Sequence, residues 1–367
     1  MELTISKTGL QDAVAQAERI AGKHLSLPVL RCVLVIAEGK EVVLRATNLD
    51  LALESRIPAN IKKEGVVAIP ADTLSAFLHT TPHAENITIV KEESHIVLST
   101  EKTTTKMRTF SHEDFPIIPA IPTQTIFSVK GGEFAGGLKS VWFAASSGSI
   151  KAELSSVYVY GEGGELVCVG TDSFRLAEKK LQAKIDDAFE GILIPLKNVN
   201  ELSRHLESAG NATAQIVSDG HQIGVTIHNT YLSSRTIEGN FPDYRQILPK
   251  EYETQAIILK QDMVDALKQS RIFSDAFNKV NARFDADDKT VTLTTVNPET
   301  GESSITLEGA VTGESLDLNF NHAYWADALQ SIKTDSIAIE LAGAGKPARI
   351  RSVGDQSFTY IVMPMNR

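Results

Sequence analysis

The residue groups that could hold a metal ion are poorly arranged for that chemistry. His79 and His83 stand four residues apart, a spacing at which two imidazoles on one helix can share a metal ion. Pro82 lies between them and should break a helix there, so the pattern favours exposed turn histidines. Three aspartates, at 285, 287 and 288, resemble the start of a calcium loop, but the glycine and the closing glutamate are out of register. A solvated turn is therefore favoured.

Motifs for catalysis are also missing. The run Gly161-Glu162-Gly163-Gly164 lies between two strand-like segments rather than before a helix, which indicates a hairpin turn and not a phosphate loop. No G-x-S-x-G elbow occurs in the sequence. We therefore predict no catalytic residue, no metal site and no cofactor.

Composition bounds the class of protein. The chain has 367 residues, which predicts two to three domains, and 42% of them are hydrophobic, which excludes a disordered chain. The formal net charge is −10, with 36 Lys and Arg against 46 Asp and Glu. An acidic balance argues against a protein that grips nucleic acid, because phosphate neutralisation supplies most non-specific affinity for DNA.

Targeting and redox signals point to the cytoplasm. The first residues lack the basic and apolar regions of a signal peptide, and no apolar run reaches 18 residues, so we expect no membrane partner. Cys32 and Cys168 each lie in an apolar run, with no C-x-x-C pair in the chain. Both are expected to be buried hydrophobes in a reducing compartment.

An internal repeat organises the elements that would position any site. A strand-like run followed by a helical pattern occurs three times, around Pro70, Pro195 and Asn321, at spacings of 125 and 126 residues. The Phe-Pro or Met-Pro pairs whose prolines are at 116, 242 and 364 keep the same order, at spacings of 126 and 122. The motif starting at Thr47 returns 124 residues later at Thr171. The chain therefore reads as three copies of a domain of about 122 residues.

Each copy predicts two helices and roughly eight strands, an α+β domain with the helices on one side of antiparallel sheets. We place the helices near residues 8–23, 71–80, 131–145, 197–209, 260–274 and 321–333. Proline at the first turn of a helix costs no hydrogen bond, which suits Pro70 and Pro195. The domains are predicted at residues 1–121, 122–247 and 248–367.

The threefold repeat carries three phrases that together resemble one family. They are VGTDSFRLA at 169–177, GNFPDYRQILPK at 239–250 and YIVMPM at 360–365. As a set they resemble the bacterial beta sliding clamps, the beta subunits of DNA polymerase III, along the whole chain. The resemblance implies three clamp domains per protomer and a head-to-tail homodimer closed into a ring, with helices lining the hole.

The function that the resemblance implies is topological. Double-stranded DNA would thread the ring without sequence specificity, and the ring would tether the replicative polymerase at high effective concentration. The protein would be a non-catalytic processivity subunit rather than an enzyme. Partners of the family are the polymerase III alpha subunit, an ATP-driven clamp loader, other polymerases and repair proteins, which bind through short peptides.

The resemblance places a hydrophobic peptide cleft between the second and third domains. The matching residues are Leu154, Thr171, Arg175, Leu176, Pro242, Ile247, Ile361, Met363, Pro364 and Met365. Flexible, polarisable Met side chains suit a groove that accepts several peptides, although Met363 and Met365, taken by themselves, are more typical of the core of a strand. Family members often have Gly-His where this chain has Ser173-Phe174, and some have Arg at Gln246, so we expect a cleft with an altered peptide preference.

The resemblance also implies DNA-facing and dimer residues. The DNA-facing positions are Lys23, Ser149, Lys151, Lys197, Arg204, Lys260 and Lys268. The predicted helices hold nine basic and nine acidic residues, so the whole negative charge would lie elsewhere, although a solvated helix face explains any single one of them. The dimer contact would join Ile272 and Phe273, which also fit a core, to the first domain near Thr105, where relatives carry an aromatic residue.

Two other classes of function stay open. A clamp paralogue could serve as a peptide-binding adaptor with a changed cleft, and the substituted Ser173-Phe174 pair keeps that alternative alive. An enzyme acting on a small substrate would need a polar catalytic cluster, which the sequence does not supply.

Overall fold

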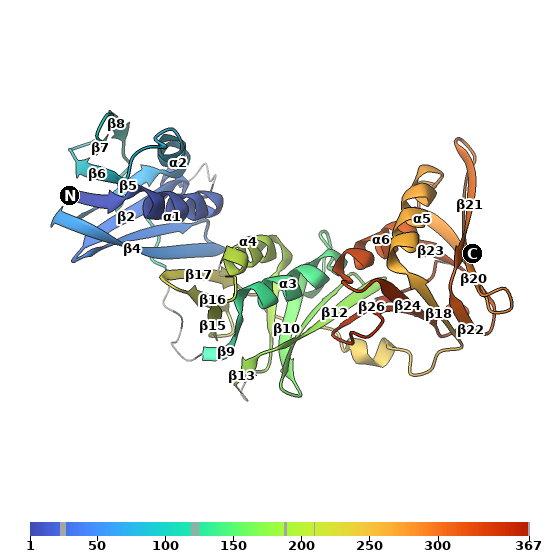
Figure 1. Cartoon of the computed structure of the whole chain (residues 1–367). Helices are drawn as coiled ribbons and strands as arrows, with labels where there is room; N and C mark the ends of the chain where they lie inside the picture. Colours follow the sequence, from blue (N-terminus) through green and yellow to red (C-terminus); the bar gives the residue numbers. More distant parts are fainter. Residues whose placement is uncertain (23–26, 119–120, 122–124, 187–188, 209, 366–367) are drawn as a thin grey trace. The chain divides into compact units, whose positions relative to one another are not determined.

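The structure is a computed structural model that describes residues 1–22, 27–118, 121, 125–186, 189–208 and 210–365 (Figure 1). Lys23, Asn366 and Arg367 lie outside the described residues. The chain forms two compact units. Unit 1 contains Met1–Ala135, Lys184–Ala188 and Lys197–Thr236, and unit 2 contains Gly136–Ala183, Phe189–Leu196 and Ile237–Arg367.

The first repeat contains two α-helices and eight strands, and it lies wholly in unit 1. Its elements are β1 (Glu2–Ser6), α1 (Lys7–Ile20), the 3-10 helix η1 (Pro28–Arg31), β2 (Cys32–Glu38), β3 (Glu41–Thr47), β4 (Leu51–Lys63), β5 (Gly65–Pro70), α2 (Ala71–His79), β6 (Asn86–Lys91), β7 (His95–Ser99) and β8 (Thr104–Arg108).

The second repeat keeps the same order of elements and contributes to both units. Its elements are β9 (Thr125–Lys130), α3 (Gly131–Val141), η2 (Trp142–Ala144), η3 (Ala152–Ser155), β10 (Ser156–Glu162), β11 (Glu165–Thr171), β12 (Arg175–Gln182), β13 (Lys184–Ile185), β14 (Ile192–Pro195), α4 (Leu196–Ser208), β15 (Thr213–Ser218), β16 (Gln222–Ile227), β17 (Thr230–Arg235) and η4 (Tyr244–Ile247).

The third repeat lies in unit 2 and again has a strand, a helix, several strands, a second helix and three final strands. Its elements are β18 (Thr254–Leu259), α5 (Lys260–Ile272), β19 (Lys279–Asp285), β20 (Thr290–Asn297), β21 (Gly301–Glu308), β22 (Ala310–Gly313), β23 (Leu316–Asn321), α6 (His322–Ser331), β24 (Ser336–Leu341), β25 (Ala348–Ser352) and β26 (Phe358–Val362). The predicted α+β architecture with two helices in each copy is confirmed.

The strands form three antiparallel sheets within the described residues. Unit 1 holds a 13-stranded sheet, in which β4 of the first repeat pairs with β17 of the second. Unit 2 holds a 9-stranded sheet, in which β12 of the second repeat pairs with β26 of the third, and a 4-stranded sheet ordered β21-β20-β19-β23. Repeats are thus joined by strand pairing rather than by side chains alone.

The helices begin where the punctuating residues predict, with one correction. Pro70 and Pro195 are the last residues of β5 and β14, directly before α2 and α4, and not the first residues of the helices. Proline fits this position because its ring fixes φ at a value that suits both the end of a strand and the residue before a helix. In the third repeat Asn321 caps the N-terminus of α6, since its Oδ1 accepts hydrogen bonds from Ala323 N and Tyr324 N.

The residues first considered for chemistry are structural. Gly163 and Gly164, with φ of 57° and 80°, form the two-residue turn between β10 and β11, because only glycine adopts both angles freely. Asp285 Oδ1 caps the β19–β20 turn by accepting from the backbone of Asp287 and Asp288. His79 Nδ1 bonds to Ser75 O at 2.8 Å.

Within the described residues no group of three or more potential ligands could hold a metal ion. Over the same residues, every helix is too short or too polar to cross a bilayer.

The two cysteines are core residues, as predicted. Cys32 and Cys168 are fully buried, and burial raises the pKa of the Cys32 thiol to about 11 and that of the Cys168 thiol to about 12. Thiolate is the reactive form, so both side chains are inert at neutral pH.

Another buried polar side chain lies in α4. His205 is 6% exposed, and neither ring nitrogen has a hydrogen-bond partner within the described part of the chain. Burial, together with the nearby positive charge of Arg19, lowers the pKa of His205 to about 4. The imidazole is therefore neutral in the folded protein across the pH range in which an exposed histidine takes up a proton.

His205 should make the fold sensitive to acid. Between pH 6.5 and 4 the unfolded chain binds a proton at this histidine and the folded chain does not, so the free energy of unfolding should fall by about 3 kcal/mol. We expect His205→Leu to lose that part of the slope when urea unfolding is measured at several pH values. The exposed His112 supplies the control, because His112→Leu should leave the slope as in wild type. Identical slopes for His205→Leu and wild type would refute this assignment.

Candidate functional site

Four of the predicted cleft residues, Arg175, Leu176, Ile361 and Met363, meet where β12 pairs with β26. Arg175 pairs with Val362 and Leu176 with Ile361 across this antiparallel seam. Beyond the last pair, Met363 N donates to Phe174 O at 2.9 Å. The strand register therefore brings the TDSFRL and YIVMPM phrases together, although about 190 residues separate them in the chain.

A tight turn between β11 and β12 sets the direction in which β12 starts. Thr171 Oγ1 donates to Arg175 O at 2.7 Å, and Asp172 Oδ1 accepts from Phe174 N and Arg175 N, both at 2.9 Å. Ser173 sits in the left-handed region with φ of 77°. Thr and Asp in this order satisfy the backbone of the turn with short side-chain bonds, and they leave Phe174 at its exposed corner.

The first repeat builds the same turn before β4. Thr47 Oγ1 donates to Leu51 O at 2.7 Å, and Asn48 Oδ1 accepts from the backbone of Asp50 and Leu51. Leu49 has φ of 76°, matching the angle of Ser173. The third repeat departs from this pattern, because Thr295 Oγ1 has no hydrogen-bond partner within the described residues. The recurrence of Thr-Asn and Thr-Asp in the sequence thus marks a real structural equivalence in the first two copies.

Arg175 ties the seam to α6. Its Nε lies 2.9 Å from Asp172 Oδ2 and its Nη1 lies 2.7 Å from Asp327 Oδ2. The guanidinium also lies over the ring of Tyr324, 4.2 Å from its centroid. Burial lowers the pKa of Arg175, but the hydrogen bond to Asp327 and the charge of Asp172 outweigh it, so the net shift is upward. Because both carboxylates pair with it, the Arg175 guanidinium links β12 to α6 inside unit 2 and is not free to bind a partner.

A hydrophobic cluster supports the seam from below. Leu176 and Ile361 are each 2% exposed and pack with Val167, Val169 and Tyr244. Tyr244 comes from η4, and its hydroxyl bonds to the Glu178 carboxylate and to Tyr160 Oη. The FPDYRQIL phrase therefore lies next to the other two because one buried tyrosine fixes it against the sheet.

The predicted cleft residues divide into a floor and a rim. Leu154, Thr171, Leu176 and Ile361 are buried, so they support the surface and do not form it. Arg175, Pro364 and Met365 are half-buried, and Pro242, Ile247 and Met363 are exposed.

The exposed apolar side chains of this region are Phe174, Ile247 and Met363, at 63%, 55% and 36% exposure, and we call these three the seam surface. Phe174 was not in the predicted set. Its signal in the sequence was a bulky apolar residue inside an otherwise polar turn.

The residues expected to face DNA are mostly engaged in local contacts. The side-chain nitrogens of Lys197, Arg204 and Lys268 lie 2.7, 2.7 and 2.9 Å from Asp50, Glu201 and Asp265, and Lys260 Nζ donates to Ile332 O. In the loop before η3, Lys151 N donates to Ser149 Oγ, and the Lys151 side chain is exposed. All of these side chains lie at least partly on the surface.

The helical charge balance needs a small correction. As described, the six α-helices hold eight basic and nine acidic residues, a net of −1 rather than zero. The difference arises because α1 starts at Lys7 and ends at Ile20 and α6 ends at Ser331, which leaves Lys23 and Lys333 outside. Nearly all of the −10 net charge still lies outside the helices.

The residues expected at the dimer contact lie at the end of α5 and on an edge strand of the 13-stranded sheet. Ile272, at the end of α5, is 66% exposed, and Phe273 after it is half-buried. Thr105 is half-buried on β8, the last strand at one end of the 13-stranded sheet. Two further exposed apolar residues, Phe277 (72%) and Val296 (58%), were missed by the sequence reading, although Phe277 stands in a polar connection where an apolar ring is unusual.

Comparison with known proteins agrees with this arrangement. Three family models match in order: the DNA polymerase III beta subunit N-terminal domain at residues 1–119, its central domain at 128–243 and its C-terminal domain at 245–366. The beta sliding clamp of Vibrio cholerae serotype O1 is 26% identical over 368 residues, covering 100% of both chains. That of Synechococcus elongatus is 25% identical over 373 residues, covering 100% of this chain and 99% of the relative.

Solved structures show the same fold. The DNA polymerase III subunit beta of Pseudomonas aeruginosa superposes with a TM-score of 0.95 at 24% identity, covering 100% of both chains. The DNA polymerase sliding clamp of Bacillus subtilis gives a TM-score of 0.94 at 22% identity, covering 100% of this chain and 99% of that one. Since the three family models together span nearly the whole sequence, the chain belongs to the family of DNA polymerase III beta subunits, the bacterial sliding clamps.

Proposed function

We propose that this protein is a DNA sliding clamp, a ring that encircles duplex DNA and tethers DNA polymerase III for processive synthesis. The observation that carries the proposal is the presence of all three clamp domains, in order, over the whole chain. Such a protein makes and breaks no bonds itself. We place it in the cytoplasm, where the replication machinery of bacteria works.

The pattern of strand pairing supports a head-to-tail dimer. In the first repeat β4 pairs with β17, the last strand of the second repeat, and in the second repeat β12 pairs with β26, the last strand of the third. By the same rule, β21 of the third repeat should pair with the last strand of a first repeat, β8. Both β21 and β8 are edge strands with an open side. An open edge attracts another strand, so a second copy of the chain is the natural partner for each.

Charge makes these two edges complementary. On β8 the exposed side chains include Lys106 and Arg108, and on β21 they include Glu302 and Glu308. Lys106 also lies 3.1 Å from Glu92 in the turn between β6 and β7, in a pair that is largely exposed. Opposite charges on the two edges favour the heterologous contact and disfavour pairing of either edge with itself. The apolar Ile272 and Phe277 add area near the end of α5.

The charge distribution is compatible with DNA inside such a ring. A closed ring stays on a duplex because it is threaded, so it needs no strong grip on phosphate. The helices carry almost none of the net negative charge, and we propose that they line the hole. An acidic exterior would discourage side-on binding and leave threading as the stable mode. Recognition without base contacts implies no sequence specificity.

The seam surface is the proposed site for short peptides of the polymerase alpha subunit, the clamp loader, other polymerases and repair proteins. Its exposed side chains, Phe174, Ile247 and Met363, are apolar, and they stand beside a cluster of buried side chains that pack together. Rigid anchoring of exposed apolar groups lowers the entropy cost of binding. Phe174 adds an aromatic ring, from which we infer a peptide preference that favours large apolar side chains.

A second candidate is a clamp paralogue that works as a peptide-binding adaptor. The exposed Phe174 favours it, because this ring changes the surface on which partner choice depends. The two functions differ in whether the protein must encircle DNA, and the next experiment separates them.

Topological binding predicts a simple result with nicked circular DNA. When a clamp loader and ATP place the protein on the circle, we expect it to remain bound through gel filtration in high salt and to leave once the circle is cut. Binding to linear DNA should weaken with salt far more steeply, because it depends on phosphate neutralisation. Loss from uncut circles, or retention after cutting, would contradict the sliding-clamp proposal and favour the adaptor.

Truncating the seam surface should weaken peptide binding. We expect Met363→Ala and Phe174→Ala each to raise the Kd for a fluorescent clamp-binding peptide by about tenfold, the usual cost of losing one apolar anchor. The control is Val353→Ala, which shortens another exposed apolar side chain outside the seam surface. Fluorescence anisotropy measures all three, and equal Kd values for Met363→Ala and wild type would remove the assignment.

Reversing the charge of one edge should weaken the dimer. Glu302→Lys is expected to raise the dimer dissociation constant by roughly tenfold, because it sets like charges against β8. Sedimentation velocity over a concentration series measures this, with the exposed Glu113→Lys as a control of equal charge change. A mixture of Glu302→Lys with Lys106→Glu should restore part of the loss. A protein that stays monomeric at micromolar concentration in its wild-type form would overturn the ring.

A further inference from the structure

Unit 1 holds a small cavity at the joint between β4 and β17, which we call the unit 1 cavity. Its volume is about 140 Å³, close to that of an apolar protein cavity that takes up one benzene molecule. Leu51 and Ala52 of β4 are buried and line it, and its other apolar side chains are Leu49, Ile117 and Ile118, with the nearby Pro116. The cavity therefore has room for one aliphatic side chain.

The backbone around this cavity repeats that of the seam surface. Arg235 N donates to Asp50 O at 2.9 Å, just as Met363 N donates to Phe174 O at 2.9 Å. Each bond joins the turn of one repeat to the end of the last strand of the next repeat. Arg235 therefore holds the place in unit 1 that Met363 holds in unit 2, with a guanidinium where the seam surface has a thioether.

A third segment completes the correspondence. The residues after Phe115-Pro116 supply Ile117 to the unit 1 cavity, and the residues after Phe241-Pro242 supply Ile247 to the seam surface. Ile117 is 91% exposed, which is unusual for a large aliphatic side chain. The two surfaces thus share a backbone frame, and the one in unit 1 combines aliphatic side chains with a cation.

Leu49 adds a second sign of a binding role. Its φ of 76° lies in the left-handed region, which a bulky side chain rarely adopts, and its side chain is 44% exposed. A residue held in this way is strained, and strained residues are concentrated at sites that bind ligands. Because the side chain is far from fully buried, the core gains little from it, and a contact with a partner is the use that the position allows.

Arg235 supplies an unpaired cation beside these apolar groups. Its side chain is exposed, and its guanidinium has no ion pair or hydrogen bond with any described residue. Asp50 also lines the cavity, but its carboxylate lies 2.7 Å from Lys197 Nζ. Gln222, which pairs with Arg235 across β16 and β17, adds an amide that can donate. An incoming carboxylate would thus meet a guanidinium that can bind it with two parallel bonds.

We infer that the unit 1 cavity is a second peptide site, which binds a short linear peptide whose aliphatic residue stands next to an aspartate or a glutamate. The cavity takes the aliphatic side chain, and Arg235 takes the carboxylate. A nucleic acid would offer Arg235 an anion but would leave the aliphatic cavity empty, so the pair of features favours a peptide.

This second site goes beyond the proposed function. All the residues that form it belong to unit 1, whereas the seam surface belongs to unit 2. Neither encircling DNA nor binding at the seam surface requires it. Its failure in an experiment would therefore leave the sliding-clamp proposal untouched.

The test follows the methyl resonances of the full-length protein labelled at Leu, Ile and Met. The probe is the blocked pentapeptide acetyl-Gly-Asp-Leu-Asp-Gly-amide. We expect the resonances of Leu49 and Ile117, identified by their loss in Leu49→Gly and Ile117→Val, to shift and saturate with a Kd of about 1 mM, an affinity that suits one side chain and one ion pair. Absence of these shifts, or shifts confined to Ile247 and Met363 of the seam surface, would overturn the inference.

Matched ligands separate the two contacts and the two classes of partner. Replacing both aspartates of the probe with asparagine, or its leucine with alanine, should weaken binding by about tenfold in each case, because each change removes one of the two contacts. A short blunt DNA duplex is titrated in a separate series. Shifts of Leu49 and Ile117 with the duplex and none with the peptide would assign the surface to nucleic acid and contradict a peptide site.

Matched variants test the two residues on which the inference depends. Arg235→Gln should weaken the probe by about tenfold, the usual cost of losing a charge-assisted bidentate contact. Arg31→Gln removes an equal charge from an exposed position of unit 1 that does not line the cavity, and it should change the Kd by less than about twofold. Equal affinity of Arg235→Gln and wild type for the probe would refute the site.

Leu49→Gly distinguishes binding from structure. Glycine adopts a positive φ without strain, so this variant should keep or raise the melting temperature. The same change removes an apolar contact of the site, so the Kd reported by the Ile117 resonance should rise by about tenfold. A lower melting temperature with unchanged affinity would show that Leu49 serves only the fold.

Discussion

Antiparallel pairing between one repeat and the next is the constraint on which the rest of the molecule depends. The β4–β17 and β12–β26 pairs are equivalent joints, and each fuses strands of two repeats into one sheet. A slip of one residue would turn Leu176 and Ile361 toward solvent and carry their neighbours out of the core, so burial fixes the register firmly. The position of every seam residue follows from that register.

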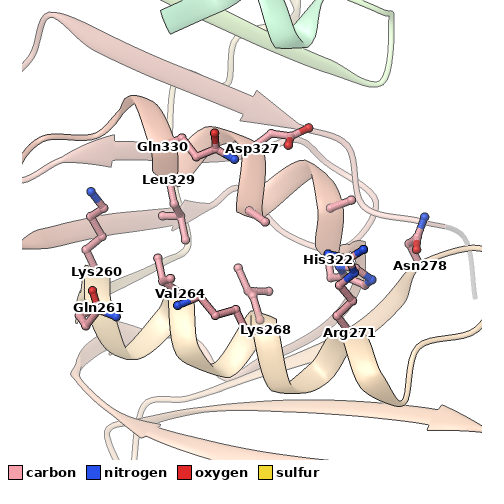
Figure 2. A pocket seen from close by; sticks show the side chains of 13 residues that line it. Lys260, Gln261, Val264, Lys268, Arg271, Asn278, His322, Asp327, Leu329 and Gln330 are labelled. Atoms are coloured by element: carbon pink, nitrogen blue, oxygen red, sulfur yellow. The ribbon is translucent and has the colours of Figure 1, made fainter. Parts of the chain in front are cut away.

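The ion pairs of Arg175 reinforce the β12–β26 pairing without exposing an unpaired charge. One guanidinium spans Asp172 at the turn and Asp327 on α6, and it rests on the Tyr324 ring. Removal of the Arg175 guanidinium would leave the Asp172 and Asp327 carboxylates without their shared cation. The same helix, α6, packs against α5 (Figure 2), so the strand joint and the helix pair share one element.

Much of the fold could be predicted from the sequence because the same pattern of elements occurs three times. The periodic markers predict the order of elements, and α2, α4, α5 and α6 lie within one or two residues of their predicted ranges. The predicted ends of α1 and α3 are too late, since apolar spacing continues past the last helical turn into the next segment. The buried roles of Leu176 and Ile361 could not be read from their types, because a peptide groove and a core both call for aliphatic residues.

Other features of the site had weak signals for a different reason. Phe174 and Phe277 are exposed rings in polar turns. Their exposure becomes visible only once the folded turns are known. The burial of His205, whose ring nitrogens have no partner within the described residues, leaves no trace in a sequence, since a buried histidine and a surface histidine look alike there. The residues that surround such a side chain lie far apart in the sequence. Its burial and its hydrogen bonds can therefore be recognised only in the folded chain.

The shared turn of the first two repeats accepts two very different side chains at its corner. Asp50 occupies in the first copy the corner that Phe174 occupies in the second, and it forms an ion pair with Lys197. The backbone bonds of the turn involve Thr, Asn and Asp side chains and make no demand on the corner residue. A substitution at this corner can therefore change the chemistry of the surface while the hydrogen bonds that shape the turn stay the same.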